Sequence, residues 1–84
     1  MKIVILYHPE YEFARSVEEF ARDFERRKGQ ALTLVSLETK EGAQMARLYD
    51  ITVYPAILAI KDDNQLVKEW QGLPLPLMEE VVLV

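Results

Sequence analysis

The residues with the most chemical potential lie in one short stretch of the chain, LYHPEYEFARSVEEF, at positions 6–20. Its first half gathers five polar or ionisable side chains: Tyr7, His8, Glu10, Tyr11 and Glu12. One imidazole and two carboxylates form an acceptable metal-ligand set, and paired carboxylates can act as general acid and general base. The stretch therefore raises the question of an active site without a cysteine, a serine nucleophile or a glycine-rich phosphate loop.

Metal and acid–base chemistry are not favoured at this stretch. His8 and the two glutamates are nearly consecutive, and acidic residues at the start of a helix are ordinary partners of its dipole. The sequence around Glu10 and Glu12 does not suggest the apolar pocket that raises a carboxyl pKa for proton transfer. We expect no metal, no cofactor and no catalytic residue here, and we expect His8 to be a solvent-exposed loop residue.

The composition excludes several classes of function. The 84 residues include no cysteine, which rules out disulfides, thiolate metal sites and thiol catalysis by this chain. The net charge of −4 has the wrong sign for a general nucleic-acid binder. No apolar run approaches the ~20 residues of a membrane span, and residues 1–6 are too short for a signal peptide. We expect a cytoplasmic domain that binds neither nucleic acid nor membrane.

The elements that position these residues follow from hydrophobic patterning. The run KIVILY, residues 2–7, is typical of a strand buried on both faces, and Pro9 breaks it. From about Glu10 to Lys28 the apolar residues recur at helical spacing, which predicts an amphipathic helix. Acidic residues are expected to lead this helix, basic residues to close it, and Gly29 to stop it.

The rest of the chain adds three strands and two short helices. Strands are predicted at 31–37, 53–60 and 66–70, and helices at 41–49 and 77–84. Two βα units favour a parallel first half, whereas the polar turn at 61–65 makes the second half antiparallel. The order β-α-β-α-β-β-α predicts one α/β domain over residues 1–84, with a four-stranded mixed sheet and three helices on its two faces.

Residues 46–72, ARLYDITVYPAILAIKDDNQLVKEWQG, resemble the second half of thioredoxin-fold proteins of the thioredoxin and glutaredoxin-like group. The shared features are a helix ending in tyrosine, a proline that opens a strand, a polar turn, and a strand closed by glycine. In element order the resemblance covers essentially the whole chain. It implies a cis peptide bond between Tyr54 and Pro55, next to backbone at Val53 or Tyr54 that is free to pair with an extended peptide.

The chain departs from that family where the family keeps its Cys-x-x-Cys motif. Counted from Pro9, the two cysteine positions fall on Tyr11 and Ala14, or on Glu10 and Phe13 if the offset is one residue. Neither alignment supplies a thiol, and disulfide exchange proceeds only through thiolate attack on sulfur. The resemblance is therefore to a member that lacks the motif and is not a dithiol–disulfide oxidoreductase.

We expect a chain without these cysteines to bind a protein or peptide. The binding groove would lie between the 7–13 loop and the segment that ends at Pro55. Ten residues are expected to form the groove: Tyr7, His8, Pro9, Glu10, Tyr11, Phe13, Ala14, Val53, Tyr54 and Pro55. The two glutamates beside it disfavour anionic ligands such as glutathione.

Two alternatives stay open. The place of Tyr7 is similar to that of the tyrosine with which some glutathione transferases stabilise a bound thiolate, which suggests a small enzyme of that type. The other alternative is a structural subunit. Its apolar C-terminal segment, residues 73–84, or its sheet edge would then form a homodimer.

Overall fold

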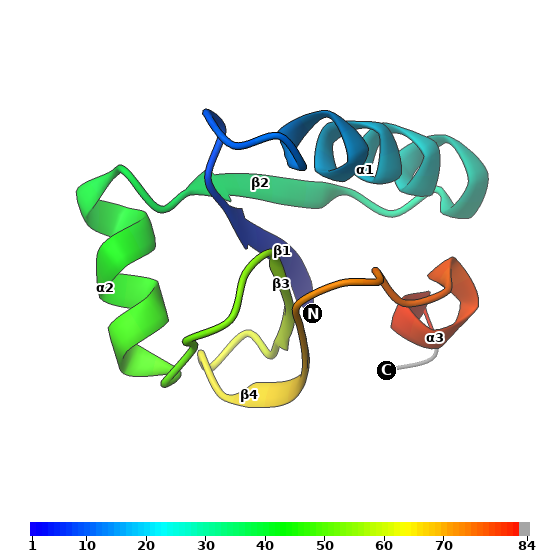
Figure 1. Ribbon diagram of the computed structural model, residues 1–84. Helices are drawn as coiled ribbons and strands as arrows, with labels where there is room; N and C mark the ends of the chain where they lie inside the picture. Colours follow the sequence, from blue (N-terminus) through cyan, green and yellow to red (C-terminus); the bar gives the residue numbers. More distant parts are fainter. Residues whose placement is uncertain (83–84) are drawn as a thin grey trace.

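The computed structural model describes residues 1–82, and these form four strands and three helices in the predicted order. The elements are β1 (Lys2–Tyr7), α1 (Ala14–Lys28), β2 (Leu32–Ser36), α2 (Lys40–Leu48), β3 (Ala56–Ile60), β4 (Leu66–Gln71) and α3 (Met78–Val82). Figure 1 shows α2 on one side of the sheet, and α1 and α3 on the other. The predicted α/β class with helices on both faces is confirmed.

The sheet has the strand order β2-β1-β3-β4 and is mixed. β1 and β2 run parallel, as two strands joined by a helical crossover should. β3 runs antiparallel to β1 and to β4, with Leu6 opposite Ala56 and Ala56 opposite Gln71. The C-terminal ends of β1 and β4 therefore meet the N-terminal end of β3 at one edge of the sheet.

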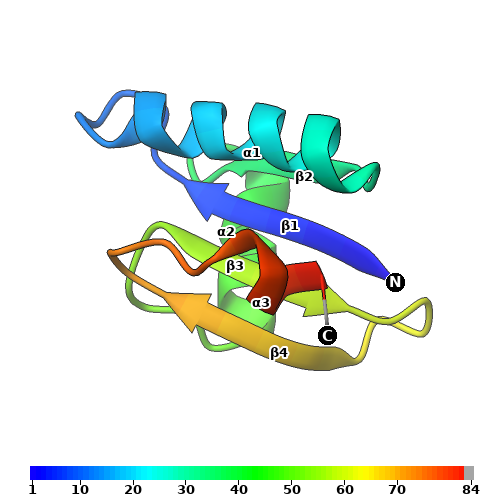
Figure 2. The same cartoon turned by 90° about the vertical axis from the view of Figure 1, so that its right-hand side faces the viewer.

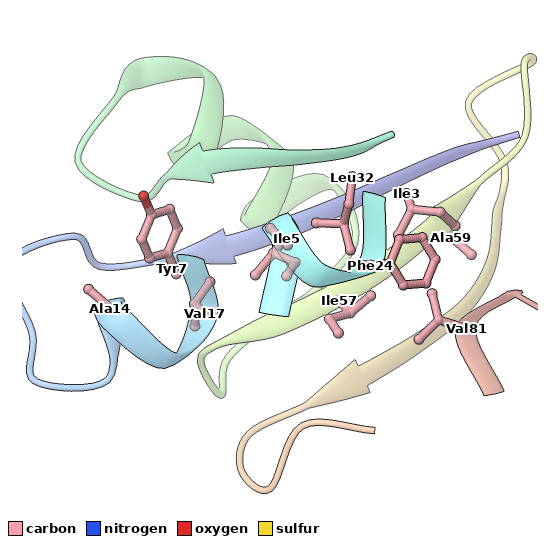
Figure 3. Packing of buried hydrophobic residues seen from close by; sticks show 11 residues of the cluster. Ile3, Ile5, Tyr7, Ala14, Val17, Phe24, Leu32, Ile57, Ala59 and Val81 are labelled. Atoms are coloured by element: carbon pink, nitrogen blue, oxygen red, sulfur yellow. The ribbon is translucent and has the colours of Figure 1, made fainter. Parts of the chain in front are cut away.

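The two central strands supply most of the core. Alternate residues of β1 and β3 point to opposite faces of the sheet, so each strand contributes to two apolar clusters. Because both faces are buried, the sequence of each strand is continuously apolar. On the α1 side, Phe24 packs among Ile3, Ile57 and Val81, and Figure 3 shows these side chains around its ring. Full burial of one such aromatic ring stabilises the fold by about 1.5–3 kcal/mol.

The first helix starts later than the sequence predicts, at Ala14 rather than near Glu10. Before it, the amide of Tyr11 donates to the carbonyl of His8 at 3.2 Å, and the amide of Ala14 donates to that of Tyr11 at 3.0 Å. In a helix that began at Glu10 the Ala14 amide would donate to the carbonyl of Glu10, but the turn directs it to the carbonyl of Tyr11 instead. Consequently the first turn of α1 contains no acidic residue, contrary to expectation. The stop at Gly29 is confirmed, with a φ of 65° and its amide bonded to the Glu25 carbonyl.

β3 and the last helix also start later than predicted, and the bounds of β2, α2 and β4 each differ from the prediction by one residue. β3 starts at Ala56, because residues 53–55 form a bend rather than part of the strand. The last helix begins at Met78, and the predicted residues 83 and 84 lie outside the described part of the chain. Within residues 1–82 no helix is long and apolar enough to cross a bilayer.

Candidate functional site

Three loops meet at the edge of the sheet where β1 and β4 end. They are residues 8–13 after β1, residues 49–55 before β3, and residues 72–77 after β4. Figure 2 shows them together on the left, with the chain terminus Met1 at the opposite end of the sheet. The antiparallel pairing of β1 with β3 brings the first two loops side by side although about forty residues separate them.

The loop before β3 has the conformation that the thioredoxin resemblance implies. The Tyr54–Pro55 peptide bond is cis, which confirms that expectation, and a second cis bond joins Leu73 and Pro74. The Tyr54 hydroxyl donates to the carbonyl of Ile51 at 2.6 Å. The tyrosine is thus tied to its own loop, with its ring turned toward the loop after β1.

The end of β4 holds this loop in place. The side-chain oxygen of Gln71 accepts hydrogen bonds from the amides of Thr52 and Val53, each at 3.1 Å. The amide of Gly72 donates to the carbonyl of Pro55 at 2.8 Å. Sequence reasoning missed the role of Gln71. The only signal was its place beside the glycine that closes β4.

A pocket opens between the loop after β1 and the Tyr54–Pro55 segment. Eight residues line it: Tyr7, His8, Tyr11, Phe13, Ala14, Val17, Tyr54 and Pro55. Seven of them are residues that the sequence placed in the groove. Pro9, Glu10 and Val53 were also placed there but do not line this pocket, and Val17, a core residue of α1, was missed.

His8 links the two sides of the pocket. Its ring stacks on that of Tyr11, with centroids 4.4 Å apart and planes 19° apart. The ring of Tyr54 meets it edge-on, with centroids 5.6 Å apart. The expectation of a solvent-exposed His8 is therefore wrong, because this side chain is half-buried between two aromatic rings.

Tyr7 lines the pocket with only 9% of its surface exposed. Figure 3 shows it beside Ala14 and Val17 at one end of the apolar cluster. Its hydroxyl donates to a carboxylate oxygen of Glu18 at 3.4 Å. Burial, and then the charge and hydrogen bond of Glu18, raise the pKa of the Tyr7 hydroxyl. The sequence signal for this partner was weak: Glu18 follows Ala14 by four residues, one turn along the helix.

The two alignments of the missing cysteines differ in this geometry. Tyr11 and Ala14 both line the pocket, Tyr11 being 63% exposed and Ala14 only 8%. Of the other pair, Phe13 lines it and Glu10 does not. Among residues 1–82 no three histidine or acidic side chains are placed to hold a metal ion. Binding through apolar and aromatic contact is what this lining can do.

Comparison with known proteins supports the architecture and goes no further. No protein-family model matches the chain, and no curated protein matches it in sequence. It is similar to a chain in the crystal structure of a complex of ferredoxin:thioredoxin reductase and thioredoxin f2. The TM-score is 0.67 at 21% sequence identity, over 98% of this chain and 73% of that chain. The fold is thioredoxin-like. At this identity the likeness concerns the fold alone.

Proposed function

We propose that this protein is a thioredoxin-fold binding module without dithiol chemistry, and that it binds an extended protein or peptide segment across the pocket. Its 84 residues contain no cysteine to attack a disulfide. What occupies the corresponding surface is an aromatic and apolar lining contributed by loops from both halves of the chain. This pocket is the observation that carries the proposal.

The backbone beside the pocket offers a second point of attachment. The amide and carbonyl of Tyr54 have no hydrogen-bond partner among residues 1–82. An extended peptide can pair with such groups as an added strand would, while its side chains enter the neighbouring pocket. The Val53 amide is already bonded to Gln71, so Tyr54 rather than Val53 is the pairing point that we propose.

The transferase alternative draws no support from Tyr7. Its hydroxyl already faces the carboxylate of Glu18, and a thiolate bound there would lie close to a like charge. The dimer alternative has a feature in its favour, since Leu77, just before α3, and Val82, at its end, are exposed while Val81 is buried. Light scattering on a Leu77→Lys variant tests it. A monomer in both the parent and the variant would end this alternative.

Titration of the ¹⁵N-labelled protein with capped pentapeptides tests the binding proposal. We expect amide shifts concentrated at Tyr11, Ala14 and Tyr54, and weaker binding by a Tyr11→Ala variant. The matched control is Leu48→Ala, which removes a similarly exposed apolar side chain from the end of α2. Peptides of varied charge that move none of the pocket amides would contradict the proposal.

A further inference from the structure

The pocket lies next to a concentration of negative charge. Residues 8–20 contain four glutamates and one arginine: Glu10, Glu12, Glu18, Glu19 and Arg15. Glu10, Glu12 and Glu19 are exposed, and none of them belongs to an ion pair among residues 1–82. Glu18 contacts the pocket residue Tyr7 directly. Glu10 and Glu12 flank the lining residue Tyr11 in the chain, and no lysine or arginine lines this largely apolar site.

The far end of α1 has the opposite character. Residues 22–28 carry four basic and two acidic side chains, and they lie away from the pocket loops (Figure 2). Two of these basic groups are already paired: Arg26 with Asp23 at 2.9 Å, and Lys28 with Glu79 at 3.3 Å. Positive charge is thus partly neutralised at one end, whereas the negative charge by the pocket is left without internal partners.

We propose that the pocket selects a cationic segment, with an apolar anchor side chain flanked by lysine or arginine. This inference rests on the proposed binding function and adds the class of ligand. The anchor would fill the space over Ala14, Val17 and Pro55, which line the pocket with apolar surface. The flanking cations would meet Glu10 and Glu12, and the exposed ring of Tyr11 adds a cation–π contact. Charge of this kind steers association and selects among partners more than it sets affinity.

Three capped pentapeptides test the ligand class. Each has a central leucine, flanked on both sides by paired lysines, paired glutamines or paired glutamates. Dissociation constants come from amide shifts at pocket residues, in about 20 mM and about 150 mM salt. We expect the lysine peptide to bind about three- to tenfold more tightly than the glutamine peptide at low salt. The glutamate peptide should bind least, and higher salt should narrow the differences.

Two double variants test whether the preference for the lysine peptide depends on the charges beside the pocket. Glu10→Gln/Glu12→Gln removes two charges beside it, and Glu25→Gln/Glu80→Gln removes two exposed charges elsewhere. The first should abolish most of the lysine preference without changing affinity for the glutamine peptide, and the second should leave the preference intact. If both double variants lose the preference for the lysine peptide equally, the inference is overturned, because the net charge of the protein alone would then explain the preference.

The outcomes also separate this inference from the function on which it rests. If all three peptides bind at the pocket with equal affinity, the charge selection is wrong and the binding function stands. The same conclusion follows if the glutamate peptide binds best. If none of the peptides moves the pocket amides, both proposals fall.

Discussion

The two loops that form the pocket are held in place by different means. Residues 8–13 are held mainly by local contacts, two turn hydrogen bonds and the stacking of His8 on Tyr11, and His8 adds one contact with Tyr54 of the other loop. The loop before β3 is fixed from a distance, by Gln71 and Gly72 at the end of β4. The first loop can therefore change its surface chemistry at small cost to the fold. The second depends on tertiary contacts, and changes in it should alter both stability and geometry.

The largest loss of stability is expected from Gly72→Ala, which changes the contact that holds the loop before β3. Gly72 has a φ of 82°, and an added Cβ would lie 3.0 Å from a methyl group of Val53. A left-handed conformation costs a non-glycine residue about 1–2 kcal/mol, so the free energy of unfolding should fall by at least that amount. Chemical denaturation measures it.

Gly29→Ala is the matched control for this substitution. Gly29 has a φ of 65°, and nothing lies within 4 Å of an added Cβ. Its loss of stability reports the backbone conformation alone. A loss at Gly72 no greater than at Gly29 would show that the contact with Val53 is unimportant.

A smaller effect is expected from Gln71→Leu. This variant removes the acceptor of the Thr52 and Val53 amides, at a cost of about 1 kcal/mol, because water replaces part of an exposed hydrogen bond. Peptide affinity should fall as well, since Tyr54 follows directly after these amides. Gln44→Leu, at an exposed position of α2, should change neither quantity. Unchanged amide shifts at residues 52–54 would refute a positioning role for Gln71.

Tyr7→Phe sharpens the comparison through its pH dependence. The raised pKa means that folding favours the neutral phenol, whereas in the unfolded chain the phenol ionises near pH 10. The stabilising contribution is therefore complete below about pH 10 and is lost as the pH rises toward the folded-state pKa. As the pH rises from about 8 to above about 10, the free energy of unfolding should fall more in the parent than in Tyr7→Phe. Chemical denaturation at each pH measures it. Parallel curves for the two proteins would contradict the burial and pairing of this hydroxyl.

The smallest change in stability is expected from Tyr11→Ala. The side chain is mostly exposed and its contacts are local, so the free energy of unfolding should stay within about 0.5 kcal/mol of the parent value. The same variant should weaken peptide binding, as described above. A large loss of stability would show that the loop after β1 is as integrated into the fold as the loop before β3.

The two loops also differ in how much of their structure could be predicted from the sequence. The apolar run at residues 2–7 predicted the strand before the first loop. The resemblance around Pro55 predicted that the two loops lie where thioredoxin-fold proteins have their binding groove. The start of α1 was placed too early, because the helical period of the apolar residues says nothing about amides used in turns before the helix. The exposure of His8 was predicted wrongly for a related reason: one of the two rings that bury it belongs to Tyr54, a residue forty-six positions away.

The sequence by itself determined the order of the elements, the α/β class and the absence of a thiol at the family's reactive position. These properties depend on local patterns and on residue identity, so they can be derived before any segment is placed against another. Only the tertiary structure decided that His8 lies between Tyr11 and Tyr54, that Glu18 accepts from Tyr7, and that Gln71 holds the loop before β3. The pairing of β1 with β3 and of β3 with β4 brings together the segments that carry His8, Tyr54 and Gln71. Glu18 reaches Tyr7 because α1 packs against β1 in the apolar cluster.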